Sequence, residues 1–174
     1  QFAYRNLPPA LRQLMPLARD SAEELLFGHN NSSVRVATSM RSGTIHRLHV
    51  SELGKMAAKH PLRAEEVKTG SLPAVPNSGI AVIESTAEGA AGLFFDMASR
   101  AEALFEQQVV LTAKDYRFHF YPWWKAREYR ADPERVKLTA NDHAYFAKVE
   151  AITGVPLDLE QRAWYVATRD GEFA

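Results

Sequence analysis

The sequence predicts an α/β fold with a mostly parallel sheet flanked by helices, and three segments carry this prediction. Residues 44–50 read as a strand that ends at Ser51-Glu52 and leads into a helix expected over residues 52–59. Ile80-Ala81-Val82-Ile83 is a continuous apolar run after a turn, which is typical of a strand buried on both faces. Residues 89–107 place apolar side chains on one helical stripe. Strands that alternate with helices favour parallel pairing.

The composition is that of a globular chain and excludes several classes of protein. Hydrophobic residues make up 46% of the 174 residues, enough for a buried core in one domain. The 21 basic and 21 acidic residues balance, so net charge gives no argument for a self-sufficient nucleic-acid-binding domain. The chain has no cysteine, which excludes disulfides and thiolate metal sites. No apolar run in the sequence is long enough to span a bilayer.

The N-terminal region predicts a short helix followed by a β-hairpin. Pro8-Pro9 starts the helix, and its apolar positions are Leu11, Leu14, Met15 and Leu17. Residues 24–27 and 34–37 have strand character and are separated by turn residues. We therefore expect these two strands to pair with each other.

The remaining elements follow from helix start signals and from alternation. A further short helix is expected over residues 63–71. Residues 116–121 alternate as another strand, which the proline at position 122 ends. Two pairs of residues have the spacing of capping boxes and predict two C-terminal helices: Thr139 with Asp142, and Asp158 with Gln161.

The first candidate site lies at the end of the strand over residues 44–50. A strand that delivers a polar residue and then a glutamate at its carboxyl end has the form of a Walker B element. In that chemistry Ser51 would help hold the magnesium shell, and Glu52 would orient and deprotonate the attacking water. Ser-Glu is also an ordinary helix start, so the simpler alternative is that Ser51 caps the following helix.

The second candidate site follows the apolar strand over residues 80–83. Here Glu84-Ser85-Thr86-Ala87-Glu88-Gly89 opens a helix, and small hydroxyl residues at that place can sense a γ-phosphate or its water. Ligands bind at the carboxyl edge of open α/β sheets, so both candidates fall where a ligand is expected. The alternative is again a helix cap, with Ser85 or Thr86 as the capping residue and Glu88 in the first turn.

Taken in order, these segments resemble the large terminase subunit of tailed bacteriophages and prophages. The resemblance covers nearly the whole chain and depends on the order and spacing of several motifs rather than on a single one. The opening Ala3-Tyr4-Arg5-Asn6-Leu7-Pro8 resembles the stretch after that family's phosphate loop. The further matching segments are Thr44-Ile45-His46-Arg47-Leu48-His49-Val50-Ser51-Glu52, Leu72-Pro73-Ala74-Val75-Pro76, Ile83 to Phe95, Tyr121-Pro122-Trp123-Trp124, Glu128-Tyr129-Arg130, Leu138-Thr139 onward and Leu157 to Trp164.

The resemblance implies a P-loop NTPase-like fold of the additional-strand, conserved-glutamate (ASCE) class and a role for each candidate residue. Glu52 matches the catalytic glutamate, and Ser51 stands where many P-loop ATPases carry Asp, so its magnesium contact would be weaker or through water. Ser85-Thr86-Ala87 matches the motif that couples hydrolysis to movement. Arg41 falls where the family often has a basic residue, and it would contact phosphate or DNA or else be a solvated loop arginine.

One departure from the family decides what the chain can do alone. The sequence contains no Gly-x-x-x-x-Gly-Lys-Ser/Thr, so a triphosphate would have neither its backbone amide nest nor its lysine. The resemblance therefore implies a fragment that is incomplete at the N-terminus, with residues 1–130 as a partial motor domain and residues 131–174 as a helical linker towards a nuclease domain. ATP and Mg²⁺ would belong to the intact parent, and neither is expected bound to this chain.

The resemblance also implies partners and a location for the intact parent. These are double-stranded DNA, the portal and the small terminase subunit, in the cytoplasm of the bacterial host, with no membrane partner. The absent first strand would bare an apolar strand edge, so self-association of the fragment is a further expectation. Two other interpretations stay open from the residues: a fragment of another P-loop helicase or translocase, and a non-catalytic prophage remnant that binds partners.

Overall fold

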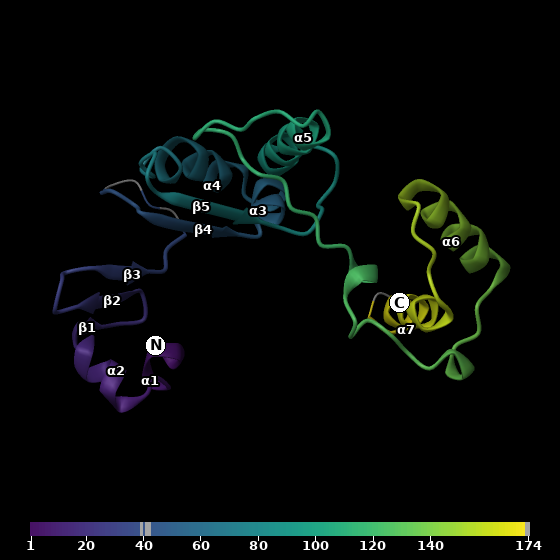
Figure 1. Ribbon diagram of the computed structural model, residues 1–174, viewed down its shortest axis with the longest axis horizontal. Coiled ribbons are helices and arrows are strands. Elements are labelled where there is room, and N and C mark those ends of the chain that lie inside the picture. The colour runs from purple at the N-terminus through teal and green to yellow at the C-terminus, as the bar shows by residue number, and fades with distance from the viewer. Residues whose placement is uncertain (39, 41–42, 173–174) are drawn as a thin grey trace. The chain divides into compact units, whose positions relative to one another are not determined.

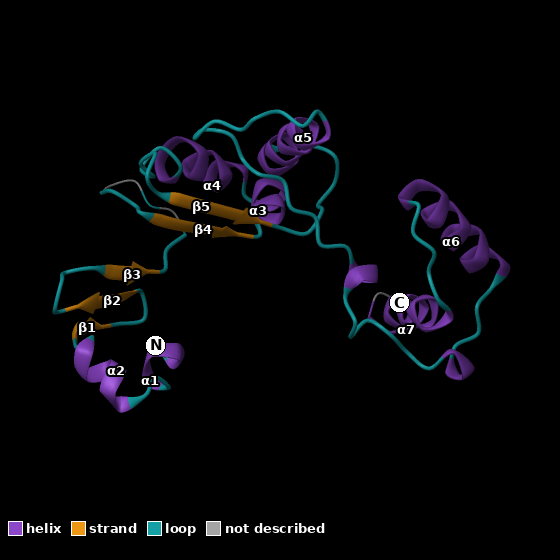
Figure 2. Cartoon of the chain, in the orientation of Figure 1, coloured by secondary structure: helices purple, strands orange, loops and turns teal. Residues whose placement is uncertain are grey.

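The structure is a computed structural model that describes residues 1–38, 40 and 43–172 (Figures 1 and 2). The fold is mixed α/β, and the chain divides into two compact units, Gln1–Phe118 and His119–Ala174. This division by compactness differs from the expected one into residues 1–130 and 131–174, which follows family resemblance. No helix in the described ranges is long and apolar enough to cross a membrane.

The N-terminal part of the first unit is a three-stranded antiparallel sheet preceded by two short helices. The elements are α1 (Phe2–Arg5), α2 (Pro9–Leu14), β1 (Leu17–Asp20), β2 (Glu24–Phe27) and β3 (Ser33–Arg35). The predicted hairpin is confirmed, because β2 pairs with β3 in the order β1-β2-β3. The assignment of Leu17 to the helix is wrong. Pro16 disfavours helical backbone at the residue before it, so α2 ends at Leu14 and Leu17 begins a strand.

The second part of this unit contains a two-stranded parallel sheet, β4 (Arg47–Ser51) and β5 (Ile80–Glu84). Their register runs from Arg47 opposite Ile80 to Ser51 opposite Glu84, which confirms the predicted parallel pairing. Figure 1 shows the helices of this part on one side of the two strands. These are α3 (Leu53–Lys59), α4 (Pro61–Glu66), the π-helical turn η1 (Val67–Ser71) and α5 (Leu93–Glu106).

The core of this part lies between the helices and the face of the sheet that carries Leu48, Val50 and Ile83. Val50, Leu53, Ala64 and Val67 are its buried residues. Leu53 is completely inaccessible to solvent and directly follows Glu52, so the core fixes the first turn of α3 at the end of β4. Packing on this face thus determines where the candidate site residues lie.

The opposite face of β4 and β5 is open in the described structure. Ile80 and Val82 are 51% and 50% exposed, so the expectation that residues 80–83 are buried on both faces is wrong. Among the residues described, no further strand pairs with β4 or β5 and no helix covers this face. An apolar run cannot reveal this difference, because it reports hydrophobicity and not the number of covering layers.

Two further expectations, for residues 89–107 and 116–121, need correction. The helix expected from residue 89 begins only at Leu93, because Gly89 and Gly92 have positive φ angles of 86° and 91°. The strand expected over residues 116–121 does not form a ladder. Its alternation is nevertheless visible, since Tyr116 and Phe118 are half-buried while Arg117 is exposed, and the Phe118 ring lies 6.4 Å from that of Phe105.

The second unit is a pair of helices, α6 (Ala140–Thr153) and α7 (Leu159–Glu172), preceded by two 3-10 turns, η2 (Trp123–Lys125) and η3 (Pro133–Arg135). Both predicted capping boxes are confirmed, at Thr139 with Asp142 and at Asp158 with Gln161. The buried core comprises Phe146, Leu157 and Val166, with Trp123, Trp124 and Tyr165 among the side chains packed against it.

Candidate functional site

The two candidate segments lie side by side because β4 and β5 are parallel neighbours. Ser51 and Glu84 are opposite each other as the last residues of the two strands. Glu52 and Ser85 are therefore the first residues beyond the sheet at the same edge. This is the edge of a parallel sheet at which ligands bind in open α/β folds.

Glu52 projects from a backbone conformation that few residues adopt. Its φ and ψ angles are 55° and 40°, in the left-handed region, and it is the N-cap residue of α3. A non-glycine residue in this region carries a conformational cost of about 1–2 kcal/mol. The exposed carboxylate Oε2 of Glu52 lies 3.5 Å from the hydroxyl oxygen of Thr86, which donates to it. The structure thus brings these two predicted site residues together.

Ser85 is joined to the start of α3 by a hydrogen bond. Its half-buried Oγ accepts the backbone N–H of Gly54 at 3.0 Å. Helix α3 has no side-chain cap from Glu52, so this bond satisfies an amide that has no acceptor within the helix. Ser85 therefore caps α3, a helix from an earlier part of the chain.

Gly54 allows the two segments to approach closely, and the sequence reasoning missed it. A Cβ atom at this position would lie 2.8 Å from Ser85 Oγ and 3.1 Å from the carbonyl oxygen of Thr86. Glycine is a poor helix former, so its place in the first turn of a short helix is the signal that could have identified it. Only the contacts across the strand ends explain why it stands there.

The helix-cap alternatives from the sequence are wrong in their original form. Ser51 is the last residue of β4 and is not the N-cap of α3, which is Glu52. Neither Ser85 nor Thr86 caps the helix that follows them, because the N-cap of α5 is Gly92. The hydroxyl of Ser85 does cap a helix, but the helix is α3.

Ser51 belongs to the open face of the sheet. It shares this face with His49 and Glu84, and His49 Nε2 lies 3.5 Å from Glu84 Oε1. The hydroxyl of Ser51 makes no hydrogen bond with any residue that the structure describes. Ala87 lies in the exposed loop after Thr86. Arg41, the predicted phosphate or DNA contact, lies outside the described residues.

The arrangement offers oxygen ligands and a potential base rather than a preformed metal site. No group of three or more His, Cys, Asp or Glu side chains that could hold a metal occurs in the described ranges. The Glu52 carboxylate and the Thr86 hydroxyl are of the hard oxygen type that suits Mg²⁺, which usually keeps several waters and binds through few protein groups. A carboxylate in this position can also accept a proton from a water. The described residues at the strand ends therefore offer a carboxylate and a hydroxyl, which can serve as oxygen ligands or as a base.

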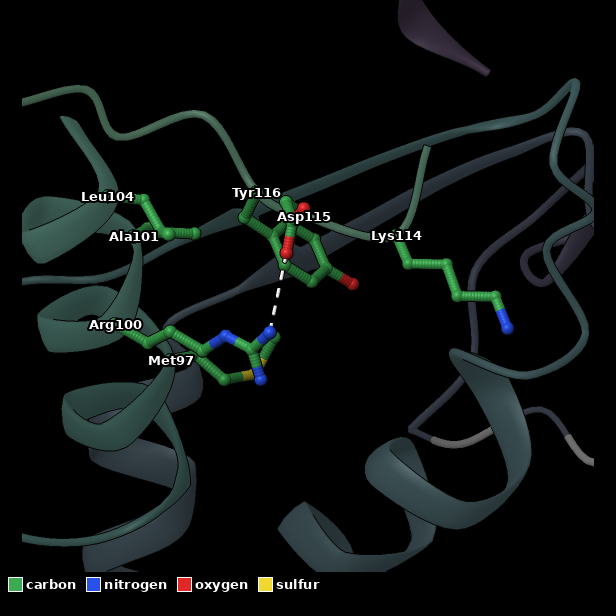
Figure 3. A pocket seen from close by; sticks show the side chains of 7 residues that line it. All are labelled: Met97, Arg100, Ala101, Leu104, Lys114, Asp115 and Tyr116. Atoms are coloured by element: carbon green, nitrogen blue, oxygen red, sulfur yellow. Dashed lines mark hydrogen bonds and ion pairs between the residues drawn. The ribbon is translucent and has the colours of Figure 1, made fainter. Parts of the chain in front are cut away.

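A hollow of about 140 Å³ lies elsewhere in the first unit, between α5 and the turn that precedes Tyr116 (Figure 3). None of the strand-end residues lines it. Asp115 accepts hydrogen bonds from the hydroxyl and amide of Thr112 and from Arg100, and these bonds lower the pKa of its carboxyl group. The carboxylate of Asp115 thus holds the turn against α5. The lining residues are Met97, Arg100, Ala101, Leu104, Lys114, Asp115 and Tyr116.

Comparisons of the chain with models of known protein families, with curated proteins and with solved structures found no match.

Proposed function

We propose that the ends of β4 and β5 form the hydrolytic part of a P-loop NTPase-like ATPase, and that the chain is part of the DNA-packaging motor of a viral terminase. Glu52 would be the base that activates water, and Thr86 and Ser85 would respond to the state of the γ-phosphate. The observation that carries this proposal is the 3.5 Å contact between Glu52 and Thr86 across two parallel strands.

The parallel pairing supports the ATPase class. In such enzymes the glutamate follows one strand and the hydroxyl-bearing motif follows the adjacent parallel strand, as the resemblance implies for this chain. Here Ser51 and Glu84 end the two strands in register, so both motifs reach the same edge. A chance arrangement of two helix starts would not require parallel neighbours with matched ends.

The backbone at Glu52 gives a second line of support. Left-handed non-glycine residues occur preferentially where function requires a side chain to be placed in a particular direction. The φ angle of 55° directs the chain sharply from β4 into α3 at the position of the proposed base. Asn31 and Gln108 have similar φ angles, but of these three residues only Glu52 stands directly after a strand of the parallel sheet.

The proposal includes the partners and location that the resemblance implies. These are ATP with Mg²⁺, double-stranded DNA, the portal and the small terminase subunit, in the cytoplasm of the bacterial host. Ser51 would reach the magnesium ion only through water, because its side chain lies on the open face beside His49 and Glu84. The chain alone should not hydrolyse ATP, since its sequence has no phosphate loop.

The gene sequence on either side of this chain provides the first test. A Gly-x-x-x-x-Gly-Lys-Ser/Thr motif some tens of residues before Gln1, with an acidic nuclease domain after Ala174, is the expected result. A start codon next to Gln1 with neither element would contradict the terminase proposal.

Enzymology provides the second test, in a protein that carries this chain together with its phosphate loop. Glu52→Gln should lower the kcat of Mg²⁺-dependent phosphate release by about 10²-fold or more, the usual contribution of a general base. Glu88→Gln is the matched control, because Glu88 is an exposed glutamate in the loop after β5 and should leave kcat unchanged. Full turnover in Glu52→Gln would overturn the assignment of Glu52. This chain alone serves as the negative control.

A further inference from the structure

We infer that Ser85 and Gly54 form a positioning pair that fixes the start of α3, and with it Glu52, against the loop after β5. The pair is joined by a hydrogen bond within the chain. The inference rests on the proposed function only in regarding Glu52 as the reacting carboxylate. Ser85 is accordingly a positioning residue that acts on Glu52 through Gly54.

The start of α3 depends on this contact because the helix has no cap of its own. The first amides of a helix have no acceptor within it and need one from outside. Glu52 occupies the N-cap position but makes no side-chain hydrogen bond there. Ser85, 31 residues further along the chain, supplies the missing acceptor to Gly54 N–H at 3.0 Å.

The absence of a side chain at position 54 makes the contact possible. Gly54 is buried, and a Cβ there would lie 2.8 Å from Ser85 Oγ, closer than non-bonded atoms approach. The same Cβ would lie 3.1 Å from the backbone oxygen of Thr86. Because backbone cannot move aside as easily as a flexible side chain, any larger residue would push the loop after β5 away from α3.

Both partners of the Glu52–Thr86 contact are adjacent to this pair in sequence. Thr86 directly follows Ser85, and Glu52 is separated from Gly54 only by Leu53, which is fully buried. Anchoring Ser85 on Gly54 therefore restricts both the hydroxyl and the carboxylate. The 3.5 Å separation of Thr86 Oγ1 and Glu52 Oε2 should depend on the bond between Ser85 and Gly54.

The experiment is solution NMR on the full chain without nucleotide. In the unaltered protein, the Gly54 amide should be protected from hydrogen exchange, and Glu52 and Thr86 side chains should show mutual NOEs. Ser85→Ala should speed exchange of the Gly54 amide by about five- to tenfold, the scale of one hydrogen bond, and abolish the Glu52–Thr86 NOEs. Ser85→Thr keeps the hydroxyl and should restore both signals.

Ser71→Ala is the matched control. Ser71 is a buried serine of the same unit whose Oγ accepts from the Met40 amide and donates to the Met40 carbonyl, so its removal costs two hydrogen bonds away from the strand ends. It should leave the Glu52–Thr86 NOEs and the Gly54 amide unchanged. Retention of both signals in Ser85→Ala, or their equal loss in Ser71→Ala, would overturn the positioning role. The NMR experiment uses no nucleotide, so it tests the positioning pair independently of ATP hydrolysis. If the enzymatic test contradicted the ATPase proposal, the NMR result would remain valid. A negative NMR result would likewise leave the ATPase proposal untouched.

Discussion

Thr86 donates its hydroxyl to Oε2 of Glu52 over 3.5 Å, although the two residues are 34 positions apart in the sequence. The contact joins the ends of two parallel strands, and the carboxylate that takes part in it comes from a left-handed backbone position. The site therefore combines a defined side-chain contact with local strain, and each of these properties can be tested by itself.

Replacement of Glu52 by glycine should stabilise the first unit. The left-handed backbone costs an L-residue about 1–2 kcal/mol, and glycine avoids this cost while losing more entropy on folding. We expect a net gain of about 0.5–1 kcal/mol in the free energy of unfolding, measured by urea titration of NMR signals from residues 1–118. Glu52→Gln keeps the strain and should stay within about 0.5 kcal/mol of the unaltered chain. A loss of stability in Glu52→Gly would show that the side chain stabilises the fold.

Replacement of Gly54 by alanine should destabilise the same unit. Alanine is the better helix former by about 1 kcal/mol, but its Cβ would overlap Ser85 Oγ at 2.8 Å and crowd the Thr86 carbonyl. Crowding of this kind costs about 1–3 kcal/mol, so after the helix-forming gain of alanine we expect a net loss of up to about 2 kcal/mol in urea titration. Gly28→Ala is the control, because its Cβ would meet its nearest atom at 3.5 Å, an ordinary contact. Equal effects at the two glycines would contradict the close approach at Gly54.

Acid should destabilise the second unit through Asp142. The Thr139 hydroxyl, Arg169 and the Thr139 amide lower the pKa of this buried carboxyl group from 3.8 to about 2. A lowered folded-state pKa stabilises the fold above pH 3.8, and this stability is lost as the pH falls through about 2. We expect a loss of about 1–2 kcal/mol between pH 4 and pH 2. Tryptophan fluorescence reports this unit alone, because all 3 tryptophans lie in it.

Two variants test whether the loss of stability between pH 4 and pH 2 comes from Asp142. Asp142→Asn should lower stability at neutral pH and flatten the dependence between pH 4 and pH 2. Part of the dependence should remain, because hydrogen bonds also lower the pKa values of Glu150 and Asp158 in the same unit. Asp170→Asn removes an exposed carboxylate from the same arginine, Arg169, and should leave the dependence unchanged. An identical pH profile for Asp142→Asn and the unaltered chain would refute the role of Asp142.

Truncation of Phe146 should unfold the second unit or nearly so. Its side chain is fully buried, contacts the Tyr165 ring edge-on at 5.6 Å, and lies beneath the guanidinium of Arg162 at 5.5 Å. Phe→Ala changes in a core cost about 3–5 kcal/mol, a large part of the stability of a unit this small. Tryptophan fluorescence at 25 °C should therefore resemble that in urea. Phe120→Ala is the control, because Phe120 is 62% exposed and should cost less than about 1 kcal/mol.

Several elements could be predicted from the sequence because their signals are local. The capping boxes at Thr139 and Asp158 bond residues three positions apart, so spacing alone identifies them. The β2–β3 hairpin and the helical stripe of α5 also depend on neighbours in the sequence. The parallel direction of β4 and β5 followed from the alternation of strands and helices, whereas their adjacency was implied by the family resemblance. For the same reason, Glu52 and Thr86 could be selected as candidates from their places after two strands.

The remaining features depended on contacts between distant segments, which the sequence does not display. Residues 116–121 alternate like a strand, but a strand also needs an edge to pair with. The apolar run at residues 80–83 is covered on one face only. The position of the packed helices decides which face is covered. By itself the sequence determined the local elements and the chemical groups available to them. The tertiary structure alone decided that Ser85 caps α3 and that Gly54 must lack a side chain, because both follow from an approach between atoms 31 residues apart along the chain.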